Sequence, residues 1–412
     1  MIEIDQFRNI ILIIVGCLVV EFVAYALVSF VNKKFQWLII QKDELPTLST
    51  KGLEKFFRHG YDSELGWVRK PNTSHIENGK EVKIKWNINK NGARTNPGFE
   101  HINSKISCYG DSFTFCRQVN DDKTWENFLS KLQKTNVLNF GVGNYGIDQS
   151  LLRLKREYPK NKTPVVVLAV VPDTISRILS VWKHYHEYGN TFAFKPRFII
   201  KNRNLELVKN PIDDEAKFYD YKKYLEKIKK YDYFYTKKFK KEKIHFPYVL
   251  TLFKNPKRNF LIIYWVLKIQ FLKKLGKKYS KIEWNPMQII MKINLNWRIN
   301  LFKNNNNVEL LKKTIEEYVL FSKQQQFKAI FLFLPQKDDL NFIKENYNFY
   351  ESLIKDISNI DGLFMVDITK NLLKVQNLDE LYSDSNEYGG HFSAKGNEKI
   401  ACLINKLILE LE

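Results

Sequence analysis

The segment 165–171 constrains the fold most, because all seven of its residues are apolar and five of them are valine. A strand that is exposed on one face alternates apolar and polar residues, whereas a continuous apolar run is typical of a strand covered on both faces. A further run of this kind lies at 329–334, and shorter strands are predicted at 106–109, 137–140 and 363–366. The chain therefore carries the strands of a buried, parallel sheet.

The segments between these runs have helical character. Residues 122–134 and 151–157 are predicted as helices, and 394–411 as a final helix with Ile400 and Ile404 on its apolar face. Strands that alternate with helices predict an α/β fold, in which helices cover both faces of the sheet.

An apolar run at 10–31 is long enough to cross a bilayer, which takes about 20 residues. Only Glu21 interrupts it, and Trp37 beyond it suits a membrane interface. We expect an uncleaved transmembrane anchor over 1–32 and a juxtamembrane connector over 33–60. A cleavable signal peptide is the alternative, because Ala-Tyr-Ala at 24–26 resembles a cleavage site.

The orientation of this anchor has arguments on both sides. Arg8 precedes the run, whereas Lys33, Lys34 and Lys42 follow it, so a count of flanking charges places the large domain in the cytoplasm. The resemblance described below favours the outside of the cell membrane, which is our expectation.

Composition changes sharply within 200–310. The stretch 222–281 holds 19 Lys and Arg residues against 3 Asp and Glu. We expect a basic helical insert that caps the main domain of 61–412 and adds no strand to the sheet. An alternative is that its apolar segment 260–267, with the lysines after it, lies on an anionic membrane surface.

The whole chain is basic, with 66 Lys and Arg residues against 45 Asp and Glu and a formal charge of +21. Such a charge suits nucleic acid, anionic lipid or anionic polysaccharide. The sequence has no nucleic-acid-binding motif, so we expect no nucleic acid partner. No cofactor is implied.

Two short motifs hold side chains suited to acyl transfer. Gly110-Asp111-Ser112 follows the strand at 106–109, and sites in parallel sheets form at the carboxyl ends of strands. His391 stands in a glycine-rich stretch before the last helix, where an imidazole can accept the proton of a serine. Either motif alone is also common in ordinary turns and helix caps.

Taken together, these motifs resemble the SGNH/GDSL hydrolase superfamily, and in particular its membrane-anchored bacterial members. The resemblance rests on blocks at 110–113, 119–125, 139–149 and 390–397, and on an N-terminal segment with motifs at 65–67, 71–72 and 91–94. It covers roughly 60–200 and 325–412. It implies a flavodoxin-like parallel sheet and a serine esterase.

The resemblance also implies roles for single residues. Ser112 would be the nucleophile and His391 the general base. The oxyanion hole would use the backbone N–H of Ser112 and that of Gly143 or Asn144. Loss of one oxyanion donor typically lowers the rate by about 10²–10³-fold.

The chain departs from the family pattern at two positions. Asp173 stands where the family has an asparagine that completes the oxyanion hole, and a carboxylate there would repel an oxyanion unless it were protonated. The alternatives are that Thr174 or another group donates instead, or that the third donor is missing. The family's aspartate before the histidine is also absent. Asp384 is the expected replacement, Glu387 is the second choice, and a Ser-His dyad is the third.

Aromatic and polar residues after the strand 165–171 suit sugar stacking at the mouth of a site. The expected substrate-binding residues are Trp182, His184, Tyr185 and Asn190. His184 and His186 would share one face of a strand, but no third metal ligand accompanies them, so we expect no metal.

Three functions remain in competition. The leading hypothesis is an esterase that removes acetyl or similar acyl groups from a cell-surface glycan. An O-acyltransferase for the same polysaccharide would use the same acyl-serine intermediate with a sugar hydroxyl as acceptor. The third is a non-catalytic glycan-binding or assembly protein with a degenerate site.

Overall fold

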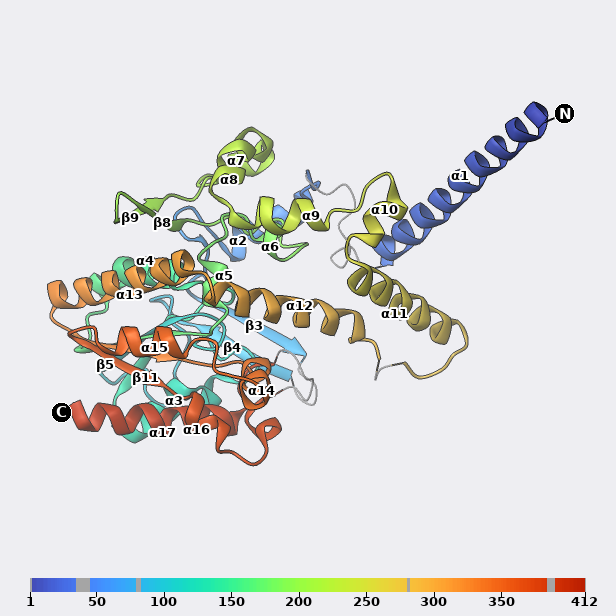
Figure 1. The fold of residues 1–412 in the computed structure, drawn as a ribbon. Coiled ribbons are helices and arrows are strands. Elements are labelled where there is room, and N and C mark those ends of the chain that lie inside the picture. Colours follow the sequence, from blue (N-terminus) through green and yellow to red (C-terminus); the bar gives the residue numbers. More distant parts are fainter. Residues whose placement is uncertain (1, 35–44, 79–82, 280–281, 384–389, 412) are drawn as a thin grey trace. The chain divides into compact units, whose positions relative to one another are not determined.

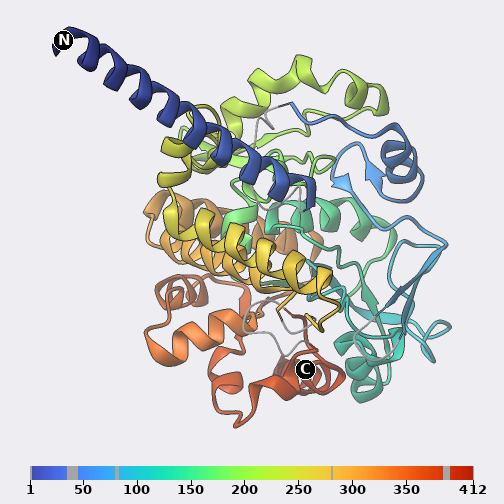
Figure 2. The same ribbon diagram turned by 90° about the vertical axis from the view of Figure 1, so that its right-hand side faces the viewer.

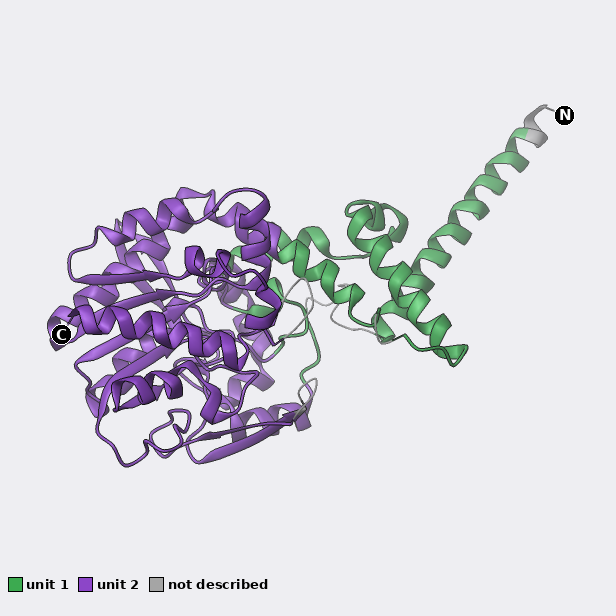
Figure 3. Cartoon of the chain, turned by 90° about the horizontal axis from the view of Figure 1, so that it is seen from below, with its two compact units in different colours: residues 1–48, 182–191, 232–294 green, residues 49–181, 192–231, 295–412 purple. Residues whose placement is uncertain are grey.

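The structure is a computed structural model that describes residues 2–34, 45–78, 83–279, 282–383 and 390–411. The chain forms two compact units, which Figure 3 shows in two colours. We call Met1–Leu48, Trp182–Thr191 and Asp232–Asn294 the anchor unit. The sheet unit consists of Ser49–Val181, Phe192–Tyr231 and Leu295–Glu412.

The centre of the sheet unit is a five-stranded parallel sheet. Its strands are β5 (Ser104–Gly110), β6 (Asn136–Asn139), β7 (Val165–Val170), β10 (Lys328–Phe333) and β11 (Leu363–Asp367). They pair in the order β11-β10-β7-β5-β6, and every pair is parallel. Numbered along the chain, this is the order 2-1-3-4-5 of the flavodoxin-like fold. The predicted fold class is therefore confirmed.

Helices cover both faces of this sheet (Figure 1). Alternate side chains such as Cys108, Val167 and Ile330 join one apolar cluster with α3 (Trp125–Gln133) and α17 (Ala394–Leu411). The opposite face lies against α4 (Ile147–Glu157) and α13 (Asn305–Gln325). On that side, the hydroxyl of Tyr318 in α13 donates to the carbonyl oxygens of Val166 and Ile330.

One helix begins earlier than its apolar pattern predicts. The expected helix 151–157 is the second half of α4, which starts at Ile147. The first turn is polar, with Asp148 and Gln149, so periodicity alone does not reveal it. The Thr174 hydroxyl accepts the Ile147 N–H at 2.9 Å and caps this turn from another segment.

The remaining elements of the sheet unit lie outside the central sheet. They are α2 (Thr50–His59), β1 (Tyr61–Asp62), β2 (Gly66–Trp67), β3 (Thr73–Asn78), β4 (Lys83–Ile88), α5 (Thr174–Arg177), β8 (Arg197–Lys201), β9 (Asn204–Val208), α7 (Glu215–Tyr219), α8 (Leu225–Tyr231), α14 (Lys337–Glu345), α15 (Glu351–Ser358) and α16 (Thr369–Leu373). β1 pairs with β2, β3 with β4, and β8 with β9, each as a separate antiparallel pair. The described part of 200–310 is mainly helical and adds no strand to the central sheet.

The anchor unit consists of helices. They are α1 (Ile2–Lys34), α6 (Lys183–His186), α9 (Lys240–Glu242), α10 (Tyr248–Phe253) and α11 (Pro256–Lys274), while α12 (Asn285–Phe302) continues into the sheet unit. Within α1, Gln6–Lys34 is long and apolar enough to cross a membrane. A membrane anchor and a signal sequence both fit this description.

Candidate active site

Ser112 lies just beyond the carboxyl end of β5, the strand where the order of the sheet reverses. Such a switch point is where open α/β sheets bind their ligands. A Cβ atom on Gly110 would lie 2.0 Å from the Ala169 carbonyl oxygen, so only glycine lets β5 approach β7 this closely before the turn. Ser112 itself is 8% exposed.

Asp111 is fully buried and shapes the turn that carries Ser112. One carboxylate oxygen accepts the Phe113 N–H at 2.8 Å. The other accepts the Val171 N–H at 3.1 Å, just after β7, and the Arg177 guanidinium at 3.0 Å. Burial raises the pKa of Asp111, while Arg177 and these hydrogen bonds oppose the rise. The Ser112 turn is thereby tied to the neighbouring strand.

The loop after β6 brings Gly143 beside the serine. A Cβ atom on Gly143 would stand 4.0 Å from the Ser112 Cβ. The Val142 N–H donates to the Gly110 carbonyl oxygen and the Tyr145 N–H to that of Val142, and neither bond uses the amides of Gly143 and Asn144. Asn144 has a φ of 68°, in the left-handed region. The expected oxyanion donors therefore lie in one turn next to Ser112.

The N-terminal segment supports both loops. The Trp67 indole N–H donates to the Gly143 carbonyl oxygen at 2.9 Å, and the Tyr145 hydroxyl donates to the Trp67 carbonyl oxygen. Arg94 is buried and its guanidinium binds Asp121 at 2.7 Å and the carbonyl oxygens of Cys116 and Val119. The upstream motifs at 65–67 and 91–94 therefore support the loops on either side of Ser112.

Asp173 follows β7 and is held by two arginines. Its carboxylate accepts from Arg177 at 3.0 Å and from Arg298 of α12 at 3.4 Å. Arg298 also pairs with Asp338 and Asp339, and these acids raise its pKa although burial lowers it. The charge of Asp173 is thus compensated by guanidinium groups, which weakens the repulsion that a bare carboxylate would exert on an oxyanion.

The Thr174 hydroxyl accepts the Ile147 N–H, as described above, and its use as an oxyanion donor stays a prediction. Asp384 and Glu387 lie outside the described residues.

The His391 ring contacts the ring of Phe113, the residue after Ser112, and the two ring centroids are 4.7 Å apart. Its backbone N–H donates to the Gln118 side-chain oxygen at 2.7 Å, and that oxygen also accepts from the Ser383 hydroxyl. Both ring nitrogens are buried and make no hydrogen bond with any residue that the structure describes. The loop before α17 therefore packs against the segment that follows β5.

Burial, together with the positive charges of Arg117 and Arg177, lowers the pKa of His391 to about 3. A neutral imidazole has the form a general base needs. However, its capacity to hold the serine proton is weak without a nearby carboxylate.

The four expected substrate-binding residues belong to the anchor unit. Trp182, His184 and Tyr185 are fully buried, and their rings contact one another and, for His184 and Tyr185, Phe239. Asn190 is partly buried. Their role in substrate binding stays a prediction, and the buried rings show that they also form an aromatic core. His184 and His186 lie in the helix α6, not on a strand.

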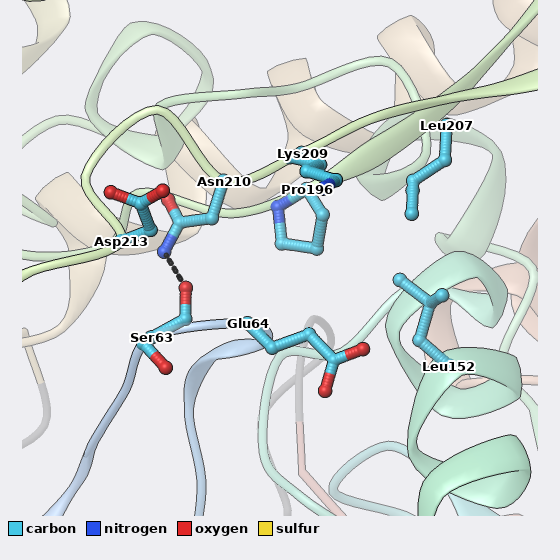
Figure 4. A pocket seen from close by; sticks show the side chains of 8 residues that line it. All are labelled: Ser63, Glu64, Leu152, Pro196, Leu207, Lys209, Asn210 and Asp213. Carbon is cyan, nitrogen blue, oxygen red and sulfur yellow. Dashed lines mark hydrogen bonds between the residues drawn. The ribbon is translucent and has the colours of Figure 1, made fainter.

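A cavity of about 340 Å³ lies elsewhere in the sheet unit (Figure 4). Its walls are formed by Ser63, Glu64, Leu152, Pro196, Leu207, Lys209, Asn210 and Asp213. The Asn210 side-chain amide donates to the Ser63 carbonyl oxygen at 3.0 Å. None of the residues predicted from the motifs lines it.

Three functional candidates were missed by sequence reasoning, namely Gln118, Arg177 and Arg298. Gln118 joins the serine block to the histidine loop, and the arginines bind Asp173. Arg177 lies four residues after Asp173, and this helical spacing of opposite charges was the one available signal. Gln118 and Arg298 have no local pattern that distinguishes them.

Comparison with models of known protein families finds no match to this chain, and comparison with curated proteins finds none either. Among solved structures, the chain is similar to a protein from Desulfitobacterium hafniense DCB-2 that is assigned to the G-D-S-L family of lipolytic proteins. The identity is 13%, the TM-score is 0.34, and the match covers 74% of this chain and 99% of that protein. The fold stated above stands on the chain's own strand order.

The low pKa of His391 predicts a loss of stability in acid. The unfolded state, with a histidine pKa near 6.5, binds a proton that the folded state refuses until the pH nears 3. The free energy of unfolding should therefore fall as the pH falls from about 6.5 to about 3, by at most about 1.4 kcal/mol per pH unit. His391→Gln should flatten this slope in urea unfolding at several pH values.

The matched control is His101→Gln, because His101 is exposed. Equal pH slopes for wild type and both variants would show that His391 is not held neutral in the folded chain.

Proposed function

We propose that the chain is a serine esterase of the SGNH/GDSL type, with Ser112 as nucleophile and His391 as general base. The observation that carries the proposal is the contact of the His391 ring with Phe113, the residue after Ser112. This contact joins two motifs 279 positions apart in the sequence, in a flavodoxin-like fold at the carboxyl end of β5.

In the proposed mechanism, the Ser112 Oγ attacks the ester carbonyl while His391 takes its proton. The negative charge that forms on the carbonyl oxygen is stabilised by the backbone N–H groups of Ser112 and of Gly143 or Asn144. His391 then protonates the departing alcohol, and water releases the acyl group from the serine. Asp173, compensated by Arg177 and Arg298, supports the loop geometry.

The proposed substrate is an acyl ester, foremost an acetyl ester, on a cell-surface glycan. Support comes from the basic charge of the chain and from the resemblance to membrane-anchored members of the superfamily. If a sugar hydroxyl replaces water in the second step, the same residues perform O-acyl transfer. Addition of a glycan acceptor to the assay separates the two outcomes, because transfer yields an acylated sugar and hydrolysis yields the free acid.

A non-catalytic glycan-binding role is the second candidate. It is favoured by the carboxylate at Asp173 and by the low pKa of His391, both of which weaken the catalytic machinery.

The first prediction of this proposal concerns the serine. Ser112→Ala should lower kcat for p-nitrophenyl acetate by about 10³-fold or more and abolish labelling by a phosphonate probe, because no other group replaces the nucleophile. His391→Gln should cause a similar loss, since the serine proton then has no acceptor. Mass spectrometry of the labelled peptide identifies the modified residue.

Ser358→Ala is the matched control, because Ser358 is an exposed serine of α15. Wild-type protein that hydrolyses no ester and takes no probe would favour the non-catalytic role.

The second prediction concerns the acid that assists His391. If Asp384 fixes the imidazole and stabilises the imidazolium, Asp384→Asn should lower kcat by about 10⁴-fold with little change in KM. Glu387→Gln should then retain wild-type kinetics, and the reverse result would assign the role to Glu387. Wild-type kcat in both variants would indicate a Ser-His dyad.

The third prediction concerns location. We propose that α1 is retained as an anchor and that the sheet unit lies outside the cytoplasmic membrane. The flanking lysines oppose this orientation, but large domains can be translocated largely regardless of such charges. Alkaline phosphatase fused to the C-terminus should be active in cells.

A fluorescent reporter that matures only in the cytoplasm is the complementary fusion. Fluorescence together with inactive phosphatase would reverse the proposed orientation and remove surface glycans from the substrates.

A further inference from the structure

One face of the helix α11 is buried within the anchor unit. Ile262, Ile263 and Val266 are buried and share an apolar cluster with Val28 and Val31 of α1. Figure 2 shows α11 running past α1. This face is the core of the anchor unit.

The opposite face of α11 is apolar as well. Phe260, Tyr264, Leu267 and Phe271 are exposed, and their spacing of 4, 3 and 4 residues places them on one stripe of the helix. A helix on the surface of a soluble domain normally turns polar residues outward. The short helix α10 adds exposed Leu250 and Phe253 to the same unit. Large apolar patches of this kind mark an interaction surface.

Lysines accompany this stripe. At about 100° per residue, Lys257 and Lys268 fall on the exposed side of α11 beside the aromatic residues. Four exposed lysines follow at its C-terminal end, namely Lys273, Lys274, Lys277 and Lys278. The sequence from Lys243 to Ile282 contains no Asp or Glu. The surface is therefore both apolar and purely cationic.

Glu21 fixes the level at which α10 meets α1. Its carboxylate accepts the backbone N–H groups of Tyr248 at 2.6 Å and Val249 at 3.2 Å, so it caps the start of α10. A carboxylate inside an apolar helix needs such partners. The start of α10 thus lies beside residue 21 of α1.

The exposed part of α1 has the length of a bilayer core. From Phe7 to Val23 its large apolar side chains are exposed, and these 17 residues rise about 26 Å against a core of about 30 Å. Beyond them, Ala24, Val28 and Val31 are buried in the anchor unit. The contacts of α1 with the rest of the anchor unit therefore gather at its C-terminal part, from Glu21 onward.

We propose that α10 and α11 form an interfacial membrane-binding hairpin, which lies on an anionic phospholipid bilayer where α1 leaves it. The apolar stripe of α11 enters the boundary between headgroups and acyl chains, and the lysines bind the lipid phosphates. This surface is independent of the proposed esterase activity. It rests on the retention of α1, which supplies Glu21 and three of the nine buried residues of the apolar cluster.

The test uses the full chain in lipid nanodiscs with a fluorophore that reports its surroundings. The fluorophore is attached to Phe271→Cys, with Cys17 and Cys402 replaced by serine because they are the exposed cysteines among the described residues. Leu409→Cys on α17 is the matched control, since Leu409 is 59% exposed and Phe271 is 62% exposed. Intact mass of the labelled chain shows separately whether α1 is retained.

The fluorophore on Phe271→Cys should be quenched by lipids that carry a nitroxide near the headgroup. Its quenching by aqueous iodide should be about threefold weaker than that of the fluorophore on Leu409→Cys. Replacement of Lys273, Lys274, Lys277 and Lys278 by glutamine should reduce the lipid quenching in discs with phosphatidylglycerol and leave the Leu409 signal unchanged. Equal iodide quenching at both sites would overturn the proposal. Protection from both iodide and nitroxide lipids would also overturn it, and would indicate a protein partner or a second copy.

Discussion

The geometry of the candidate site depends on the buried guanidinium group of Arg177. It binds Asp111 beside Ser112, the Tyr145 carbonyl oxygen in the loop after β6, and Asp173 after β7. Three loops from three strands therefore share one side chain with donors in a fixed planar arrangement. Loss of this cation would break two buried ion pairs, those with Asp111 and Asp173, and breaking a buried pair typically costs several kcal/mol. The site is thus built from an ion network as well as from the sheet.

This network explains how an aspartate is tolerated at position 173. Charges alternate from Asp111 through Arg177, Asp173 and Arg298 to the Asp338–Asp339 pair. Burial raises the pKa values of Asp338 and Asp339, while the positive charge of Arg298 opposes the rise. Asp173 therefore takes part in a chain of compensated charges. An oxyanion at Ser112 would meet this network and not an isolated carboxylate.

The sequence predicted the fold well because β7, β10 and β11 are largely apolar runs, and burial on both faces leaves that signal in the local composition. Ser112 and His391 were predicted as catalytic residues because motifs surround them, and the structure brings the two motifs into contact through Phe113. Gln118 and Arg298 were not predicted, because their partners lie 273 and 125 positions away in the sequence and no short pattern encodes such pairs. Trp182 shows the converse limit. Aromatic residues suit a sugar site and a core equally, and only the structure shows this ring to be fully buried.

The unpaired imidazole of His391 is the point where structure and chemistry constrain each other most. A buried polar atom without a partner costs about 1–3 kcal/mol, and both ring nitrogens lack one among the described residues. One nitrogen is accounted for if it accepts the proton of Ser112 during catalysis. The other then needs an acceptor, and a carboxylate there would also raise the pKa from about 3 toward a useful value. Arg117 and Arg177 oppose protonation of this ring, so the acid must offset two positive charges in addition to burial. A serine esterase that uses this histidine would therefore depend on an assisting acid more strongly than a site without these arginines would.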